Sequence, residues 1–377
     1  MKKSITPNLI KQNNRNLIYL YILHHPGVSQ QDIAYELRLS RPTVTTNLAE
    51  LESAGMIEKS GQQENDQVGR KAIAYSAVLD YRVAIGLDIH HKEVKLITVN
   101  LLGEYSARVV HNITYKNTDA YRKKVCALTN DYIKEQGYKK EQILGIGIAV
   151  PGIVSGDGSV VTYGKILDCT GLTIDTFSRY LDYPCRFFHD SDSAAVSELW
   201  VSPNLRDAYY LQIGIHLGCA MIANRTITTG IHGHNATIEH IFMANNKKKC
   251  YCGRIGCAET LCSLSALCGE EPVDDFFARV RAKDKKTMKQ FDDYLKNLSR
   301  IINALSLMYD KDVIIGGFIA PYLIEEDMDR LHEYVRELNP FDDSDKFIYI
   351  SHMPKHNITI GAALPYITEF LSREDIS

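Results

Sequence analysis

Two stretches of the sequence have the same order of predicted elements, and this repetition restricts the fold more than any other feature. Residues 82–104 and 208–230 each read as a strand, a turn with Gly or Asp, a second strand and a small turn. Strands and helices alternate after each opening, ending in a helix from Thr359, which predicts an α/β fold. We therefore expect two similar lobes that face a cleft, with ligands at the carboxyl ends of the strands.

The composition is that of a globular chain. It has 377 residues, of which 45% are hydrophobic and 24% are charged, and a net charge of −3. No run approaches the roughly 18 apolar residues that cross a bilayer, and the N-terminus lacks the apolar segment of a signal peptide. We expect a cytoplasmic protein without membrane contact, in which most of the nine cysteines are reduced.

The first 80 residues contain the pattern of two short helices joined by a tight turn. Ser29 can cap the first helix, with Asp32 in its first turn. Ser40 can cap the second, which tolerates Pro42 in its first turn and ends at Gly55. This is the helix-turn-helix pattern.

Two strands, 56–60 and 71–78, follow these helices, and the polar segment 61–70 between them reads as a wing. The order of helix, turn, capped helix and wing predicts binding to double-stranded DNA. The predicted DNA-binding residues lie on the second helix and at the base of the wing: Ser40, Arg41, Pro42, Thr43, Thr45, Thr46, Asn47, Arg70 and Lys71. Nine Lys and Arg stand against eight Asp and Glu in residues 1–80, so a helical subdomain without DNA contacts stays an alternative.

Cys250, Cys252 and Cys257 form the one cysteine pattern in the chain. Gly253 and Gly256 lie between them and let the backbone fold back, so that three thiolates can meet. The odd count and the reducing compartment disfavour a disulfide. A metal site and a cluster of free surface thiols stay open on these residues alone.

The motifs resemble the ROK family, which contains sugar-responsive repressors and sugar kinases of the actin-like ATPase fold. The most specific motif, Cys-x-Cys-Gly-x-x-Gly-Cys-x-Glu, stands intact from Cys250 to Glu259, and His240 stands where the family has its zinc histidine. The resemblance implies a structural zinc ion held by His240, Cys250, Cys252 and Cys257. Tetrahedral nitrogen and sulfur ligands of this kind suit zinc.

The resemblance extends over nearly the whole chain and implies its domain organisation. Residues 1–80 would form the winged helix-turn-helix domain, and residues 81–377 a two-lobed effector domain. The lobes would span about 81–195 and 196–377, with the last helix packing back on the first lobe.

The sequence departs from the family where the kinases hold nucleotide phosphates. After Asp88, the residues His90, His91 and Lys92 replace a Gly-Gly-Thr sequence, and His216 interrupts the second glycine-rich loop. Glycines let the backbone approach phosphates closely, so side chains at these places block them. We therefore expect no kinase activity and interpret Asp192, at the position of the catalytic base, as a ligand-binding residue.

The sugar site of the family is altered as well. Thr237 stands where the family has a Glu, and Ser191 where it has an Asn, while Asp192, His240 and Glu259 remain. These five residues are the predicted effector-binding set. The altered set predicts a sugar or sugar derivative that differs from a plain hexose, or a domain that binds no effector.

Together these features predict a transcriptional repressor of carbohydrate-utilisation genes. It would bind operator DNA as a homodimer, with a tetramer as the alternative, and respond to a sugar-derived effector in a catalytically inactive cleft. Two alternatives remain: a sugar kinase that keeps a DNA-binding domain, and a DNA-binding scaffold with an inert effector domain.

Overall fold

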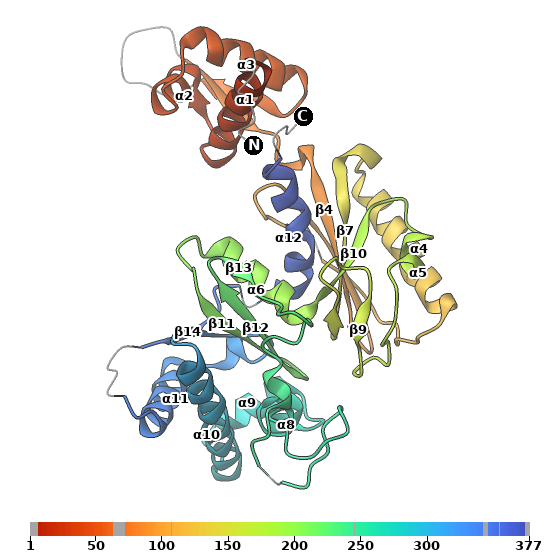
Figure 1. Ribbon diagram of the computed structural model, residues 1–377, viewed down its shortest axis with the longest axis vertical. Helices are drawn as coiled ribbons and strands as arrows, with labels where there is room; N and C mark the ends of the chain where they lie inside the picture. Colours follow the sequence, from red (N-terminus) through yellow and green to blue (C-terminus); the bar gives the residue numbers. More distant parts are fainter. Residues whose placement is uncertain are drawn as a thin grey trace.

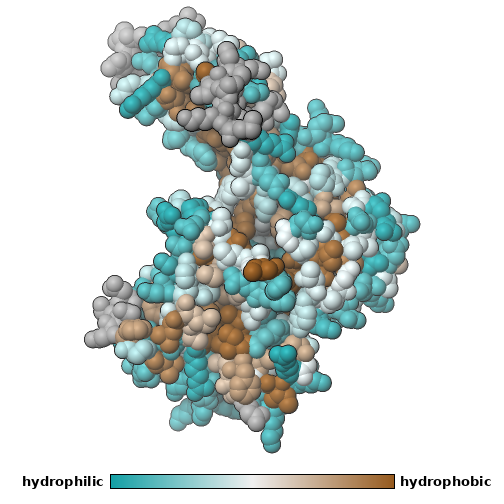
Figure 2. Space-filling model, viewed as in Figure 1, coloured by the Kyte–Doolittle hydropathy of each residue, from teal (hydrophilic) through white to brown (hydrophobic). Residues whose placement is uncertain are grey.

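The computed structural model describes residues 7–62, 72–106, 108–244, 246–341, 346–353 and 355–373. A small N-terminal domain stands at one end of the molecule, and two lobes follow (Figure 1). In the space-filling view a narrow neck joins this domain to the rest (Figure 2). Within the described residues, no helix is long and apolar enough to span a bilayer.

The N-terminal domain consists of three helices and a small sheet. Its elements are α1 (Pro7–His24), β1 (Val28–Ser29), α2 (Gln30–Glu36), α3 (Arg41–Ser53), β2 (Ile57–Gln62) and β3 (Ile73–Ala77), with strand order β1-β3-β2. The side chain of Ser29 accepts a hydrogen bond from the backbone of Asp32, and Ser40 caps α3 in the same way through Thr43. The two caps fix where α2 and α3 begin, and hence the turn between them.

The first lobe is built on a five-stranded sheet of order β10-β7-β4-β5-β6. Its elements are β4 (Val83–Ile89), β5 (Val94–Val99), β6 (Val109–His111), α4 (Asp119–Gln136), β7 (Ile143–Val150), β8 (Ile153–Val154), β9 (Val161–Tyr163), α5 (Asp175–Ser178) and β10 (Cys185–His189). Alternate residues of β4 point to opposite faces. Val83, Ile85 and Leu87 pack with α4 and α5 on one face, and Gly86 faces the last helix on the other.

The second lobe repeats this plan with strand order β13-β12-β11-β14-β15. Its elements are α6 (Asp190–Val201), β11 (Ala208–Ile213), β12 (Leu217–Ala223), β13 (Thr226–Ile227), α7 (Glu259–Cys262), α8 (Leu264–Cys268), α9 (Val273–Arg281), α10 (Lys285–Met308), β14 (Asp312–Gly316), α11 (Glu325–Leu338) and β15 (Ile348–Ile350). Helices α7 to α11 share one core with the outer face of this sheet, and α6 packs on β11 and β12.

Helix α12 (Asn357–Leu371) ends the fold but packs on the first lobe and on α6 (Figure 1). Three glycines bring backbones into direct contact. A Cβ atom on Gly86 would lie 1.8 Å from the carbonyl oxygen of Thr359, one on Gly147 1.8 Å from that of Ala362, and one on Gly361 1.7 Å from that of Ser193. Helix α12 therefore contacts both lobes so closely that no methyl group fits at these three glycines.

The carboxyl end of α12 reaches the N-terminal domain. Phe370 of α12 belongs to the same buried apolar cluster as Ile18 and Tyr19 of α1 and Leu48 of α3. The side chain of Asn16 also donates a hydrogen bond of 3.0 Å to the backbone oxygen of Arg373. One continuous core thus connects the N-terminal domain with the helix between the lobes.

Candidate functional site

The predicted metal ligands are brought together. One ligand atom from each of His240, Cys250, Cys252 and Cys257 lies within 4.8 Å of the others. Sγ of Cys250 lies 3.7 Å from Nδ1 of His240, and the Sγ atoms of Cys252 and Cys257 are 3.7 Å apart. We refer to residues 246–258, which carry the three cysteines, as the knuckle.

Local backbone geometry explains how the knuckle closes. Gly253 and Gly256 have φ angles of 91° and 83°, which other residues adopt with strain. A Cβ atom on Gly256 would lie 2.2 Å from the carbonyl oxygen of Ala244. The knuckle can therefore turn back on itself only with glycine at this position.

The chemistry of the donor set fits a structural zinc ion. Three thiols and one imidazole are the ligands of closed tetrahedral zinc sites. Nε2 of His240 is buried and has no hydrogen-bond partner within the described residues. Burial by itself would raise the pKa of the Cys252 thiol, but hydrogen bonds from the Arg254 backbone and the neighbouring thiols lower it. Burial raises the pKa of the Cys250 and Cys257 thiols, so the case for ligation rests on the four donor atoms that lie together and on the unpartnered nitrogen of His240.

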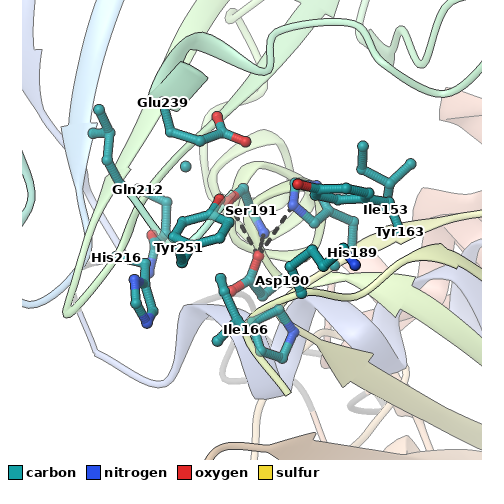
Figure 3. A pocket seen from close by; sticks show the side chains of 15 residues that line it. Ile153, Tyr163, Ile166, His189, Asp190, Ser191, Gln212, His216, Glu239 and Tyr251 are labelled. Carbon is teal, nitrogen blue, oxygen red and sulfur yellow. Dashed lines mark hydrogen bonds and ion pairs between the residues drawn. The ribbon is translucent and has the colours of Figure 1, made fainter. Parts of the chain in front are cut away.

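A small cavity lies between the two lobes beside the knuckle (Figure 3). The first lobe contributes the ends of β7, β9 and β10, and the second lobe contributes β11, β12, Glu239 and the knuckle. The lining residues are Pro151, Gly152, Ile153, Tyr163, Lys165, Ile166, His189, Asp190, Ser191, Gln212, His216, Leu217, Gly218, Glu239 and Tyr251. Its volume is about 40 Å³. The cavity thus lies at the carboxyl ends of the parallel strands β7 and β10, where α/β folds bind ligands.

Asp190, and not the predicted Asp192, lines this cavity. Asp190 is the first residue of α6, directly after β10. Asp192 lies two residues further, about 200° around the helix, and its carboxylate is 3.7 Å from Nδ1 of His189. Of the predicted effector residues, Ser191 lines the cavity, and its backbone N–H donates to Oδ1 of Asp190 at 2.7 Å.

The other three predicted effector residues have different partners. Thr237 does not line the cavity, and its hydroxyl donates to the backbone oxygen of His234. His240 belongs to the metal cluster. Glu259 is buried and accepts two hydrogen bonds of 2.7 Å, from the His216 ring and from the backbone N–H of Leu217. Its carboxylate therefore holds His216 and Leu217 in the wall of the cavity, and Glu259 itself is not among the lining residues.

Sequence reasoning missed Glu239, His189 and Gln212 as cavity residues. Burial raises the pKa of Glu239 to about 7. Burial opposes protonation of His189, but the Asp192 and Asp190 carboxylates raise its pKa to about 9. A protonated imidazole beside these carboxylates offers a polar ligand both donors and acceptors. His189 directly precedes Asp190, and Glu239 directly precedes His240. This adjacency is the sequence signal that could have identified both as cavity residues.

Side chains fill the first of the two phosphate loops. Nε2 of His90 lies 2.8 Å from Oδ2 of Asp88, and Nζ of Lys95 lies 3.9 Å from the same oxygen. The charges of His90 and Lys95 keep the pKa of Asp88 low although burial would raise it. His91 and Lys92 are exposed and do not take part in this pairing. In the second loop, the ring of His216 is held by Glu259.

A larger cavity of about 1010 Å³ lies between Asp88 and the loop of Gly317 and Phe318. Lys92, Lys95 and Asn357 also line it. Of the paired residues, Asp88 and Lys95 line this cavity and His90 does not.

The candidate DNA surface is the N-terminal part of α3. Arg41, Pro42, Thr45 and Thr46 are exposed there, and Ser40 and Thr43 form the cap. The prediction for Asn47 is wrong. Asn47 is 2% exposed and donates to the backbone oxygen of Thr43.

Helix periodicity explains the error at Asn47. Its position is three residues after Val44 and four before Leu51, so it falls on the buried face of α3. Arg70 and Lys71 lie outside the described residues. Gln30, which sequence reasoning missed, donates to the backbone oxygen of Arg41 and to the Thr45 hydroxyl and so ties α2 to this surface.

Comparisons with known proteins match both parts of the chain. Residues 84–364 match the ROK family, and residues 20–70 match the MarR family. A xylose repressor of Caldicellulosiruptor bescii is 23% identical over 393 residues, which cover 97% of this chain and 98% of that protein. The DNA-binding transcriptional dual regulator NagC of Escherichia coli K12 is 23% identical over 264 residues, which cover 69% of this chain and 64% of that protein.

Solved structures show the same fold. A ROK family transcriptional regulator, a homolog of the E. coli MLC protein, superposes with a TM-score of 0.71 at 20% identity, over 96% of this chain and 100% of that chain. A ROK family glucokinase from Streptomyces griseus, in complex with glucose and AMPPNP, gives a TM-score of 0.66 at 18% identity, over 75% of this chain and 98% of that chain. The fold is thus an N-terminal helix-turn-helix domain followed by an actin-like sugar kinase fold.

Proposed function

We propose, from the premise that this chain belongs to the ROK family, that it is a DNA-binding repressor of carbohydrate-utilisation genes. The observation that carries the proposal is the union of a MarR-type helix-turn-helix domain with a ROK domain whose first phosphate loop is closed by the pairing of Asp88 with His90. The relatives named xylose repressor and NagC support the same function.

In this proposal a sugar or sugar derivative binds in the cavity beside the knuckle, and the protein acts in the cytoplasm as a homodimer. Asp190, Glu239 and Gln212 would bind its hydroxyl groups. A zinc ion held by His240 and the three cysteines would brace the wall of the cavity and supply no chemistry to a reaction. Effector binding would change operator affinity by a coupling of about 1–3 kcal/mol.

DNA binding is tested at Arg41, which is exposed on α3. A duplex selected from a random library by the full-length protein should contain a two-fold repeat. We expect Arg41→Ala to weaken binding to that duplex by about 1–3 kcal/mol if the guanidinium contacts a base edge. Fluorescence anisotropy measures the affinity, and Lys123→Ala on the exposed face of α4 is the control. Failure to select any duplex at low salt would refute the proposed repressor function.

Sugar kinase activity is the alternative that the ROK fold leaves open, because Asp190 lines the cavity as a catalytic base would. We expect no ATP consumption above background with D-xylose, D-glucose or N-acetyl-D-glucosamine, since His90 and Lys95 engage Asp88. A coupled ATP assay measures this. Turnover that Asp190→Asn abolishes would establish a kinase instead.

A further inference from the structure

Tyr251 connects the metal cluster with the cavity. It lies between Cys250 and Cys252 in the knuckle, and its side chain lines the cavity (Figure 3). Its ring centroid is 5.3 Å from that of His216 and 5.1 Å from that of His240, both in edge-on geometry. The ring is thus held between a cavity wall and a metal ligand.

The space that remains beside this ring is small. A cavity needs about 10–15 Å³ to hold one water by this measure, so about 40 Å³ holds roughly three waters. A monosaccharide therefore fits only when part of the wall moves. Figure 3 shows Tyr251 in the middle of the lining residues, with Gln212 and His216 to one side and Asp190 to the other.

Tyr251 belongs to the part of the wall that is formed by loops, together with Lys165, Ile166 and His216. His189 lies on β10, Gln212 on β11, and Ser191 in the first turn of α6. Tyr251 lies outside helices and strands, on a loop turned by Gly253 and Gly256.

We propose that Tyr251 limits the size of the effector, so that an N-acylated hexose binds more weakly than a smaller, unsubstituted monosaccharide. The proposal rests on the proposed function, because it concerns the same cavity. The ring lines the cavity, so a bulkier sugar would have to displace it further than a small one. Removing the ring should therefore weaken the discrimination against larger sugars, whereas removing the hydroxyl group alone should not.

The test measures binding of three probes, D-xylose, D-glucose and N-acetyl-D-glucosamine, to the full-length zinc-loaded protein by calorimetry. The ratio of the Kd for N-acetyl-D-glucosamine to that for D-xylose is the readout. We expect this ratio to fall about tenfold or more in Tyr251→Ala, in the range known for pockets that discriminate by size. It should change by less than about twofold in Tyr251→Phe and in the control Tyr349→Ala on strand β15.

Zinc content is measured for each variant to show that the knuckle is intact. If Tyr251→Ala loses zinc, Tyr251→Leu takes its place, with a smaller fall in the ratio. An unchanged ratio in a zinc-loaded variant, or a native protein that prefers the N-acylated sugar, overturns the role of Tyr251 and leaves the proposed function standing. If a sugar binds to Tyr251→Ala but not to the native protein, this supports the proposed role of Tyr251. Binding of no probe to any variant overturns both this role and the proposed sugar response.

Discussion

Replacing Cys250 with serine is expected to remove the bound metal and to destabilise the second lobe. Cys250 is 4% exposed and lies 3.7 Å from His240, so a hydroxyl at this position is a weak ligand in a buried place. Loss of a structural metal belongs to the mutations that cost more than about 4 kcal/mol. We expect zinc content to fall from about one ion per chain to near zero, and the thermal unfolding midpoint to fall with it.

A matched control separates the metal from the general effect of losing a thiol. Cys268 is partly buried outside the cluster, and Cys268→Ser should keep its zinc and most of its stability. Atomic emission gives the metal content, and calorimetry gives the unfolding midpoint. Full zinc content in Cys250→Ser would show that the cluster is not the site. Loss of zinc with unchanged stability would show that the ion does not brace the fold.

The meeting of the three cysteines could be predicted because its geometry is local, whereas the metal and its fourth ligand, His240, came from the resemblance to the ROK family. Three of its ligands lie within eight residues, and the glycines between them allow few other conformations. The cavity is different, because its residues come from strands, loops and helix α6, which meet only after folding. Sequence reasoning chose Asp192 where the structure places Asp190. Which residue of α6 faces the cavity depends on where β10 ends, and the sequence leaves this open by a residue or two.

The fold itself was predicted better than the contacts inside it. Alternating strands and helices and two similar openings predicted two lobes, and the ROK-type structures confirm this class. The predicted final helix from Thr359 begins at Asn357 in the structure. Asn47 shows the limit of residue type as a signal. A polar side chain was expected at the surface, but helix phase placed it on the buried face of α3.

Replacing Gly361 with alanine is the second change for which we expect a large effect on stability. The sign of the change in unfolding free energy tells whether helix propensity or steric contact decides. An exposed glycine within a helix normally costs about 0.5–1 kcal/mol relative to alanine, so Gly361→Ala should stabilise α12 if propensity decides. In the structure the new Cβ atom would lie 1.7 Å from the carbonyl oxygen of Ser193 on α6. That oxygen belongs to the backbone and cannot turn away, so α12 and α6 must separate. We expect destabilisation of about 1–3 kcal/mol or more.

Urea unfolding measures this change, with Gly156→Ala as the control, because nothing lies within 4 Å of a Cβ atom at Gly156. The same helix shares a buried cluster with Ile18 and Leu48 of the N-terminal domain through Phe370. Separation at Gly361 should therefore also loosen that domain, which hydrogen exchange of α1 and α3 would detect. Greater stability in Gly361→Ala would mean that α12 does not press on α6. In that case α12 could not carry a displacement of α6, which begins at Asp190 in the cavity, to the N-terminal domain.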